Sequence, residues 1–160
     1  MAERSGELRV EQVAPARAFA LRRAVLRPWL RLDELAADDE GAPTFAALAG
    51  PDEEVVGCAT LFEEAAPESV PEAARRLPGF RLRSMATAPE HRGTGVGTAV
   101  LTAVLAEVAR RGGGVLWCHA RAGAVDFYST MGLARAGAEF EIERIGVHVV
   151  MWCVVEAATG

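Results

Sequence analysis

The feature that most constrains this chain is a glycine-rich turn between an apolar strand and an amphipathic helix. The turn spans residues 89–98 and has glycine at positions 93, 95 and 97, so a ligand can approach its backbone closely. Apolar side chains then recur at helical spacing from Val96 to Val108. Because the start of a helix leaves backbone N–H groups without intrahelical partners, the segment 80–111 predicts a cradle for an anion such as a pyrophosphate.

Composition excludes several other classes of protein. The chain has 160 residues, 51% of them hydrophobic and 24% charged, which is typical of one globular domain, expected here over residues 1–160. A net charge of -5 argues against a nucleic-acid partner. No apolar run reaches the ~18 residues of a membrane span, and the polar N-terminal segment favours a cytoplasmic protein.

The three cysteines, Cys58, Cys118 and Cys153, each lie inside an apolar run. An odd and scattered set forms neither a disulfide framework nor a metal-binding spacing. We therefore expect three buried free thiols that pack as small hydrophobic groups, and no metal ion.

The hydrophobic pattern predicts an α/β chain of the α+β type. The two strands that flank the helix after the glycine turn should be parallel neighbours, and the remaining strands mostly antiparallel. In the first helix the buried stripe is expected at Phe19, Ala20, Arg23 and Leu26. Residues 65–79 are expected to form an irregular loop with one helical turn. Strands are expected at residues 6–13, 44–49, 55–63, 80–87, 115–120, 133–143 and 147–156. Helices are expected at 16–26, at 29–35, after the glycine turn and at 123–131, and Leu30 and Leu35 are the packing residues of the second helix.

Three phosphate-binding interpretations compete for the turn. A P-loop needs a lysine before its Ser/Thr, but all 17 basic residues are arginine. A dinucleotide fingerprint needs the spacing G-x-G-x-x-G, and Thr98 stands in place of its third glycine. The remaining interpretation is the pattern Arg-x-x-Gly-x-Gly, from Arg92 to Gly97.

That turn, together with the strand before it, resembles the acetyl-CoA-binding motif of the GNAT superfamily of N-acetyltransferases. Residues 124–133 (AVDFYSTMGL) are similar to the family's Ala-x-x-Phe-Tyr-x-x-x-Gly-Phe motif, with Leu133 in place of the last phenylalanine. One helix and one strand separate the two motifs, as in the family. The resemblance implies a mixed, mostly antiparallel sheet of about seven strands with a splayed parallel pair at its centre and flanking helices.

The resemblance also implies acetyl-CoA as co-substrate. The pantetheine arm would pair with the backbone of Met85 and Thr87, and the pyrophosphate would lie on the N–H groups of residues 92–98. His119 occupies a position at which close-looking sequences carry an asparagine that bonds the arm. The implied cofactor-binding residues are Met85, Ala86, Thr87, Arg92, Gly93, Thr94, Gly95, Val96, Gly97, Thr98, His119, Phe127 and Tyr128.

For the chemistry, a neutral amine attacks the thioester carbonyl and a thiolate leaves. A backbone N–H at Met85 or Ala86 would stabilise the oxyanion, and Tyr128 matches the family's general acid, which protonates the sulfur. The general base is not assigned. The candidates are Glu63 and Glu64, which lie near the expected amine, the histidines His119 and His148, and a chain of water molecules.

The expected function is transfer of an acetyl group from acetyl-CoA to an amine of a small molecule or a peptide. The alternative is a domain of the same fold that binds acyl-CoA as a sensor or interaction module without turnover. A nicotinamide enzyme fits the glycine spacing poorly. The apolar segment 147–155 is a candidate surface for a homodimer, and Arg81, Arg83 and Arg121 are candidates for the acceptor side.

Overall fold

The computed structural model describes residues 8–26, 28 and 42–159. The helix expected at residues 29–35, with Leu30 and Leu35, lies outside this range. Within it, no helix is both long and apolar enough to cross a membrane.

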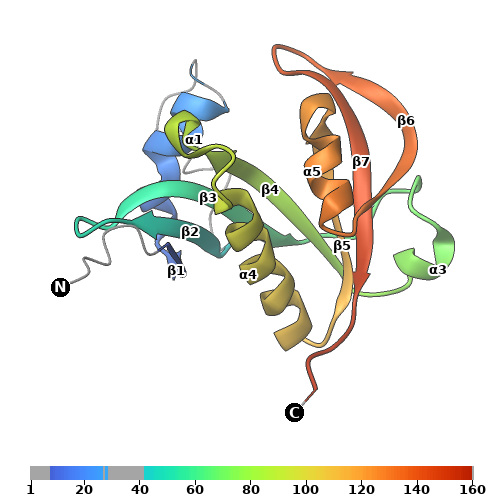
Figure 1. Cartoon of the computed structure of the whole chain (residues 1–160). Coiled ribbons are helices and arrows are strands. Elements are labelled where there is room, and N and C mark those ends of the chain that lie inside the picture. Colours follow the sequence, from blue (N-terminus) through green and yellow to red (C-terminus); the bar gives the residue numbers. More distant parts are fainter. Residues whose placement is uncertain (1–7, 27, 29–41, 160) are drawn as a thin grey trace. The chain divides into compact units, whose positions relative to one another are not determined.

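The strands form a mixed sheet with the hydrogen-bonding order β1-β2-β3-β4-β5-β7-β6 (Figure 1). Strands β4 and β5 are parallel, as predicted, and the pairs β1–β2, β2–β3, β5–β7 and β6–β7 are antiparallel. The fold class is thus confirmed, with strand ends within a few residues of those expected. The strands are β1 Arg9–Val13, β2 Thr44–Ala49, β3 Glu54–Glu63, β4 Gly79–Thr87, β5 Gly114–Arg121, β6 Ala134–Ile142 and β7 Gly146–Val155.

The helix after the glycine turn is α4, Val96–Arg110. The single turn expected between residues 65 and 79 is α3, Glu72–Arg75. Short 3-10 turns precede the other helices because proline or alanine-glycine sequences open them. The remaining helical segments are η1 Pro15–Ala18, α1 Phe19–Val25, η2 Pro89–His91, η3 Ala122–Ala124 and α5 Val125–Thr130.

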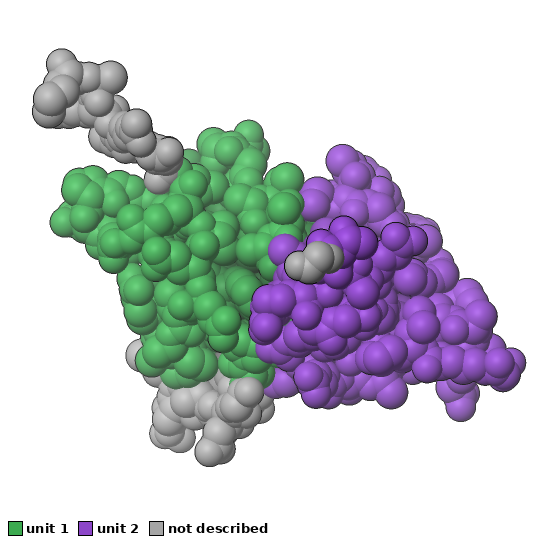
Figure 2. All heavy atoms as spheres, turned by 90° about the horizontal axis from the view of Figure 1, so that it is seen from below, with its two compact units in different colours: residues 1–61, 84–104 green, residues 62–83, 105–160 purple. Residues whose placement is uncertain are grey.

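Two compact units make up the chain (Figure 2). Unit 1 comprises residues 1–61 and 84–104, and unit 2 comprises residues 62–83 and 105–160. Strand β4 contributes to both, with the change at Ser84. That residues 1–160 act as a single domain stays a prediction.

In unit 1, neighbouring residues of β3 face opposite sides of the sheet because side chains alternate along a strand. Cys58 packs with Ala18 and Ala86 and with the apolar side chains of α1. Gly57 faces the start of α4, where a Cβ atom would lie 2.4 Å from Cγ1 of Val96. The missing side chain of Gly57 therefore lets α4 approach the sheet closely.

The buried stripe predicted for the first helix is wrong by one position. Ala18 and Arg22 are buried, whereas Ala20 and Arg23 are exposed. The small Ala18 packs in the core cluster with Cys58, and the larger Phe19 is only half-buried. Arg22 is buried beside Phe19, with its guanidinium carbon 5.7 Å from the ring centroid.

In unit 2, one face of the sheet carries a core formed by the segment around α3 and the strands β5, β6 and β7. This core cluster consists of Val70, Ala74, Val115, Ala136 and Val150, with Ala66, Phe140 and Trp152 packed against it. Since residues 115, 117, 119 and 121 of β5 share a face, the even-numbered Leu116, Cys118 and Ala120 point to the other face. Cys58 and Cys118 are buried as predicted, but Cys153 is only half-buried.

Replacing Gly57 with alanine should lower the free energy of unfolding by about 1–3 kcal/mol, because the new methyl group overlaps Val96, whose branched side chain has little freedom to move. Chemical denaturation measures this loss. Gly123→Ala is the matched control, since no atom lies within 4 Å of a Cβ there. Equal stability of the two variants would mean that α4 does not pack closely on Gly57.

Candidate active site

The glycine turn adopts a backbone that its sequence requires. Gly93 and Gly95 have φ angles of 77° and 89°, in the left-handed region that L-residues with a Cβ rarely adopt. A Cβ at either position would meet no atom within 4 Å. The backbone of the turn therefore faces open space.

Helix α4 begins directly after this turn. Val96 is 2% exposed and anchors the first turn of the helix in unit 1, and the N–H of Ala99 donates to the carbonyl of Gly95. The N–H groups before Ala99 belong to the helix start, where no intrahelical acceptor exists. The first turn of α4 contains no acidic residue, and the exposed Arg92 precedes it. The partial positive charge of the helix N-terminus and the full positive charge of Arg92 therefore occur together at the start of α4.

Strand β4 contains one residue with a left-handed backbone, Ser84. Its φ of 57° is uncommon for a residue other than glycine. The Ser84 carbonyl accepts the thiol of Cys58, 3.6 Å away, and further on the Ala88 N–H donates to the Val56 carbonyl at 2.8 Å. A left-handed residue within a strand re-aims the backbone groups that follow it, here those of Met85. Sequence analysis did not single out Ser84.

The parallel ladder between β4 and β5 is short. It joins Gly79 with Val115 and ends where Arg81 meets Trp117. Within the described part of unit 2, Leu82 and Arg83 have no partner on β5, although β5 continues to Arg121 along β7. Leu82 and Arg83 therefore lie beyond the end of the parallel ladder with β5.

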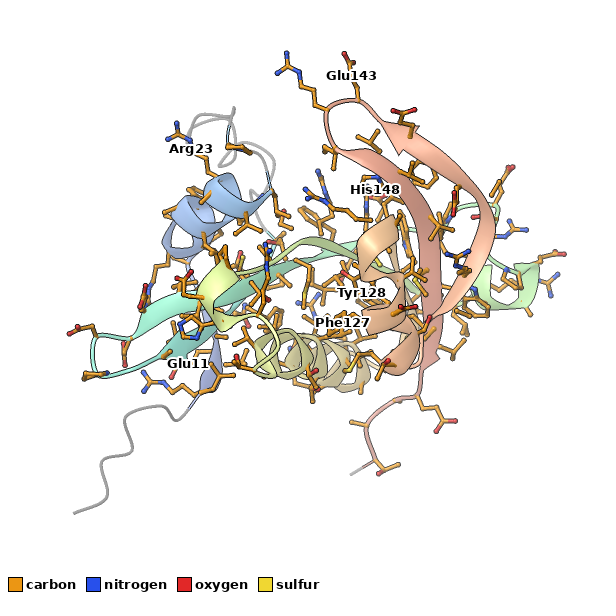
Figure 3. All side chains as sticks on the ribbon, turned by 45° about the horizontal axis from the view of Figure 1, so that its top comes forward. Glu11, Arg23, Phe127, Tyr128, Glu143 and His148 are labelled. Carbon is orange, nitrogen blue, oxygen red and sulfur yellow. The ribbon has the colours of Figure 1, made fainter. Side chains whose placement is uncertain are left out.

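Tyr128 lies on α5 and is 6% exposed. Its ring meets Phe127 edge to face, with centroids 5.1 Å apart, and its phenol lies beside the thiol of Cys118 on β5. Burial, and then the neighbouring Cys118, raise the pKa of Tyr128 well above its ordinary value. The phenol is therefore neutral and can donate its proton. Figure 3 labels Phe127 and Tyr128 on this helix.

His119 follows Cys118 on β5 and points to the opposite face of the sheet. Its Nδ1 lies 3.3 Å from Nη2 of Arg81. A guanidinium has no acceptor atom, so Nδ1 must accept this hydrogen bond and the proton of the neutral ring must lie on Nε2. Burial, then the positive charge of Arg81 and then His148 lower the pKa of His119, and Glu64 opposes this shift.

Arg81 organises the surroundings of His119. Its Nη1 donates to the Glu64 carboxylate at 3.1 Å, and its guanidinium carbon lies 4.9 Å from the ring centroid of Trp117. The Trp117 Nε1–H donates to the backbone carbonyl of Glu64 at 2.9 Å. These contacts fix the guanidinium and, through it, the tautomer of His119. Arg83 is the next residue on the same face of β4, and its guanidinium carbon lies 5.5 Å from the ring centroid of Phe62.

The other candidate bases have different surroundings. The Glu63 carboxylate accepts a hydrogen bond from Arg111 at 3.2 Å, and its side chain is 72% exposed. Arg111 follows the last residue of α4, whereas the glycine turn precedes the first. Arg81 therefore links His119 to Glu64. Among the described contacts, none links Glu63 to His119 or to Tyr128. His148 is 4% exposed and lies on β7 across the register from Arg121.

No group of three or more His, Cys, Asp or Glu side chains in the described ranges could hold a metal ion. The site residues are instead neutral donors, arginines and backbone groups. Such a set suits the binding of an anionic ligand and the transfer of protons.

Comparisons with known proteins point to one family. A model of the acetyltransferase (GNAT) family matches residues 11–133. YitI, an uncharacterized N-acetyltransferase of Bacillus subtilis (strain 168), is 25% identical over 146 residues, which are 91% of this chain and 95% of the relative.

Solved structures share the fold. The ribosomal-protein-S18-alanine N-acetyltransferase of Escherichia coli superposes with a TM-score of 0.71 at 16% identity, covering 96% of this chain and 97% of that one. An aminoglycoside 6'-N-acetyltransferase complexed with coenzyme A superposes with a TM-score of 0.70 at 13% identity, covering 95% of this chain and 99% of that one. Since the family model matches well over half of the residues, this chain belongs to the acetyltransferase (GNAT) family and is an N-acetyltransferase.

Proposed function

We propose that this enzyme moves an acetyl group from acetyl-CoA to an amine of a small molecule or a peptide by direct attack on the thioester. The observation that carries the proposal is the buried, neutral phenol of Tyr128. A leaving thiolate needs a proton donor, and a phenol kept protonated by burial is one at any working pH. A domain that only binds acyl-CoA would not need it.

The donor would be held by the turn and by β4. The pyrophosphate would lie on the N–H groups of Arg92 to Thr98, with the Arg92 guanidinium adding a charge-assisted contact. The open space above Gly93 and Gly95 supports this placement. The pantetheine arm would pair with the backbone of Met85, Ala86 and Thr87 beyond the short parallel ladder. The aminoglycoside 6'-N-acetyltransferase of the same fold is complexed with coenzyme A, and this agrees with the proposed donor.

The reaction would then run in two steps. The amine attacks the carbonyl carbon, and the N–H of Met85, re-aimed by the left-handed Ser84, stabilises the oxyanion. The intermediate collapses, the C–S bond breaks, and Tyr128 protonates the thiolate. His119 and Phe127 would contact the pantetheine arm, His119 through its Nε2–H. In this proposal Glu63 is the least favoured of the candidate bases, because Arg111 holds its exposed carboxylate at the far end of α4.

The acceptor is an amine of undetermined structure. The two structural neighbours are named for different acceptors, an alanine of ribosomal protein S18 and an aminoglycoside. A panel of primary amines, amino acids and short peptides, followed by release of the CoA thiol, tests the function directly. Binding of acetyl-CoA without thiol release from any acceptor would favour the non-catalytic alternative. Binding of NADH but not of acetyl-CoA would overturn the proposal.

Replacing Tyr128 with phenylalanine should lower kcat by about 10²–10⁴-fold, because the general acid is lost while the packed ring stays. The dissociation constant of acetyl-CoA, measured by calorimetry, should change by no more than about twofold, since only one hydroxyl is removed from the fold. Unchanged turnover would remove Tyr128 from the mechanism.

Replacing Arg92 with alanine should weaken acetyl-CoA binding by about 10–100-fold, because a hydrogen bond to a charged group contributes about 1.5–3 kcal/mol. The loss should shrink as salt is added, since an exposed charge is screened. Arg76→Ala is the control: the Arg76 side chain is 76% exposed, and its ion pair in the described part of the chain is with Glu72 one turn earlier. Equal affinities of the two variants would exclude a contact between Arg92 and the phosphates.

A further inference from the structure

The face of unit 2 opposite Tyr128 carries four aromatic rings in a row, which we call the imidazole face: Trp117, His119, Phe140 and His148. The ring centroids of Trp117 and His119 are 5.5 Å apart, those of His119 and Phe140 5.0 Å, and those of Phe140 and His148 5.9 Å. The register places Phe140 of β6 opposite His148 of β7. Two imidazoles thus lie on either side of one phenyl ring. Figure 3 labels His148 on β7 and Tyr128 on α5.

The two imidazoles are held in opposite tautomers. His119 accepts from Arg81 at Nδ1 and carries its proton on Nε2. His148 has its Nδ1 2.8 Å from the backbone carbonyl of Gly146, and a carbonyl can only accept. The Nδ1 of His148 is therefore protonated, and the Nε2 of its neutral ring bears a free electron pair. Within the described part of the chain, no group donates to this atom.

Among the described residues, the charged groups near this face are three arginines and one carboxylate. Arg81 lies beside His119, Glu64 pairs with Arg81, and the charge of Arg83 also acts on His119. Arg121 lies across the register from His148. The Glu64 carboxylate is engaged by Arg81, and His119 has its basic nitrogen engaged by the same guanidinium. His148 is then the one titratable side chain among these whose proton-accepting atom has no partner in the described residues.

We propose that Nε2 of His148 is the general base that takes a proton from the acceptor amine, and that the Arg81 contact confines His119 to the role of an Nε2–H donor. This rests on the proposed acetyl transfer. The amine nitrogen forms the C–N bond and gives one proton to His148. The C–S bond breaks, and the thiolate takes one proton from Tyr128. Solvent returns the proton from His148 to the phenolate, so the cycle balances.

Strand geometry separates the two proton-transfer groups. Tyr128 is on the Cys118 side of β5, and the imidazole face is on the other side, because side chains alternate along a strand. An amine delivered to the imidazole face and a thiolate on the Tyr128 side would exchange protons with different groups. This separation prevents the acid from simply protonating the incoming amine.

The tautomers can be measured in the unmodified protein. Long-range ¹H–¹⁵N correlation spectra distinguish the two ring nitrogens, and the chain has only 3 histidines, so His119→Asn and His148→Asn spectra assign them. The expected result is an Nε2–H tautomer for His119 and an Nδ1–H tautomer for His148. The reverse pair of tautomers would overturn the proposal without any activity measurement.

The kinetic test uses the same two variants, because each keeps one contact. Asparagine at 148 retains a donor toward the Gly146 carbonyl but lacks Nε2, and asparagine at 119 retains an acceptor toward Arg81 but lacks the Nε2–H. With each amine that the wild type acetylates, His148→Asn should lower kcat/KM by about 10²-fold or more. The loss should appear in kcat, because the proton acceptor acts in the chemical step.

His119→Asn should raise KM and leave kcat unchanged. A kcat lost in His119→Asn, or a kcat left intact in His148→Asn, would overturn the assignment. Thermal melts show whether His148→Asn folds, and if it does not, the tautomer spectra decide. If the wild type acetylates no amine of the panel, the proposed function fails, which is a different outcome from a wild type that is active and a variant that is unaffected.

Discussion

The pleat of one strand, β5, separates the two halves of the proposed chemistry. Successive residues of a strand face opposite sides, so Cys118 and His119 cannot share an environment. Cys118 lies against Tyr128, where burial keeps a phenol protonated. His119 lies against Arg81, whose guanidinium dictates the tautomer. A slip of the register by one residue would exchange the two faces. Pairing with β4 on one edge and β7 on the other holds the beginning of β5 in register.

Features that a short segment determines by itself could be predicted from sequence. The glycine turn is one, because its left-handed backbone at Gly93 and Gly95 needs residues without a Cβ. The long helix from Val96 is another, since its apolar spacing spans four turns. The element order followed from alternating strand and helix patterns, and the Phe127-Tyr128 segment from its similarity to a family motif. The first helix shows the limit, since its buried side depended on which residue Cys58 could accommodate.

Features that depend on packing between distant segments could not be predicted. Nothing in the sequence marks Ser84, because serine has no strong preference for a positive φ. The carbonyl of that residue accepts the thiol of Cys58, 26 residues earlier. The Arg81 contacts reach 17 residues back to Glu64 and 38 forward to His119, so they depend on strand register. Glu63 and Glu64 are neighbours in sequence, yet alternation sends one to Arg111 and the other to Arg81.

Burial of the cysteines has a practical consequence for work on the enzyme. Desolvation raises the pKa of Cys58 and of Cys118 to about 12, and that of Cys153 to about 11. An unburied cysteine thiol ionises at about 8.5, and only the thiolate attacks disulfides and alkylating agents. The protein's own thiols should thus leave colourimetric thiol trapping almost free of background. For the same reason, alkylating agents should react slowly with the cysteines of the folded enzyme.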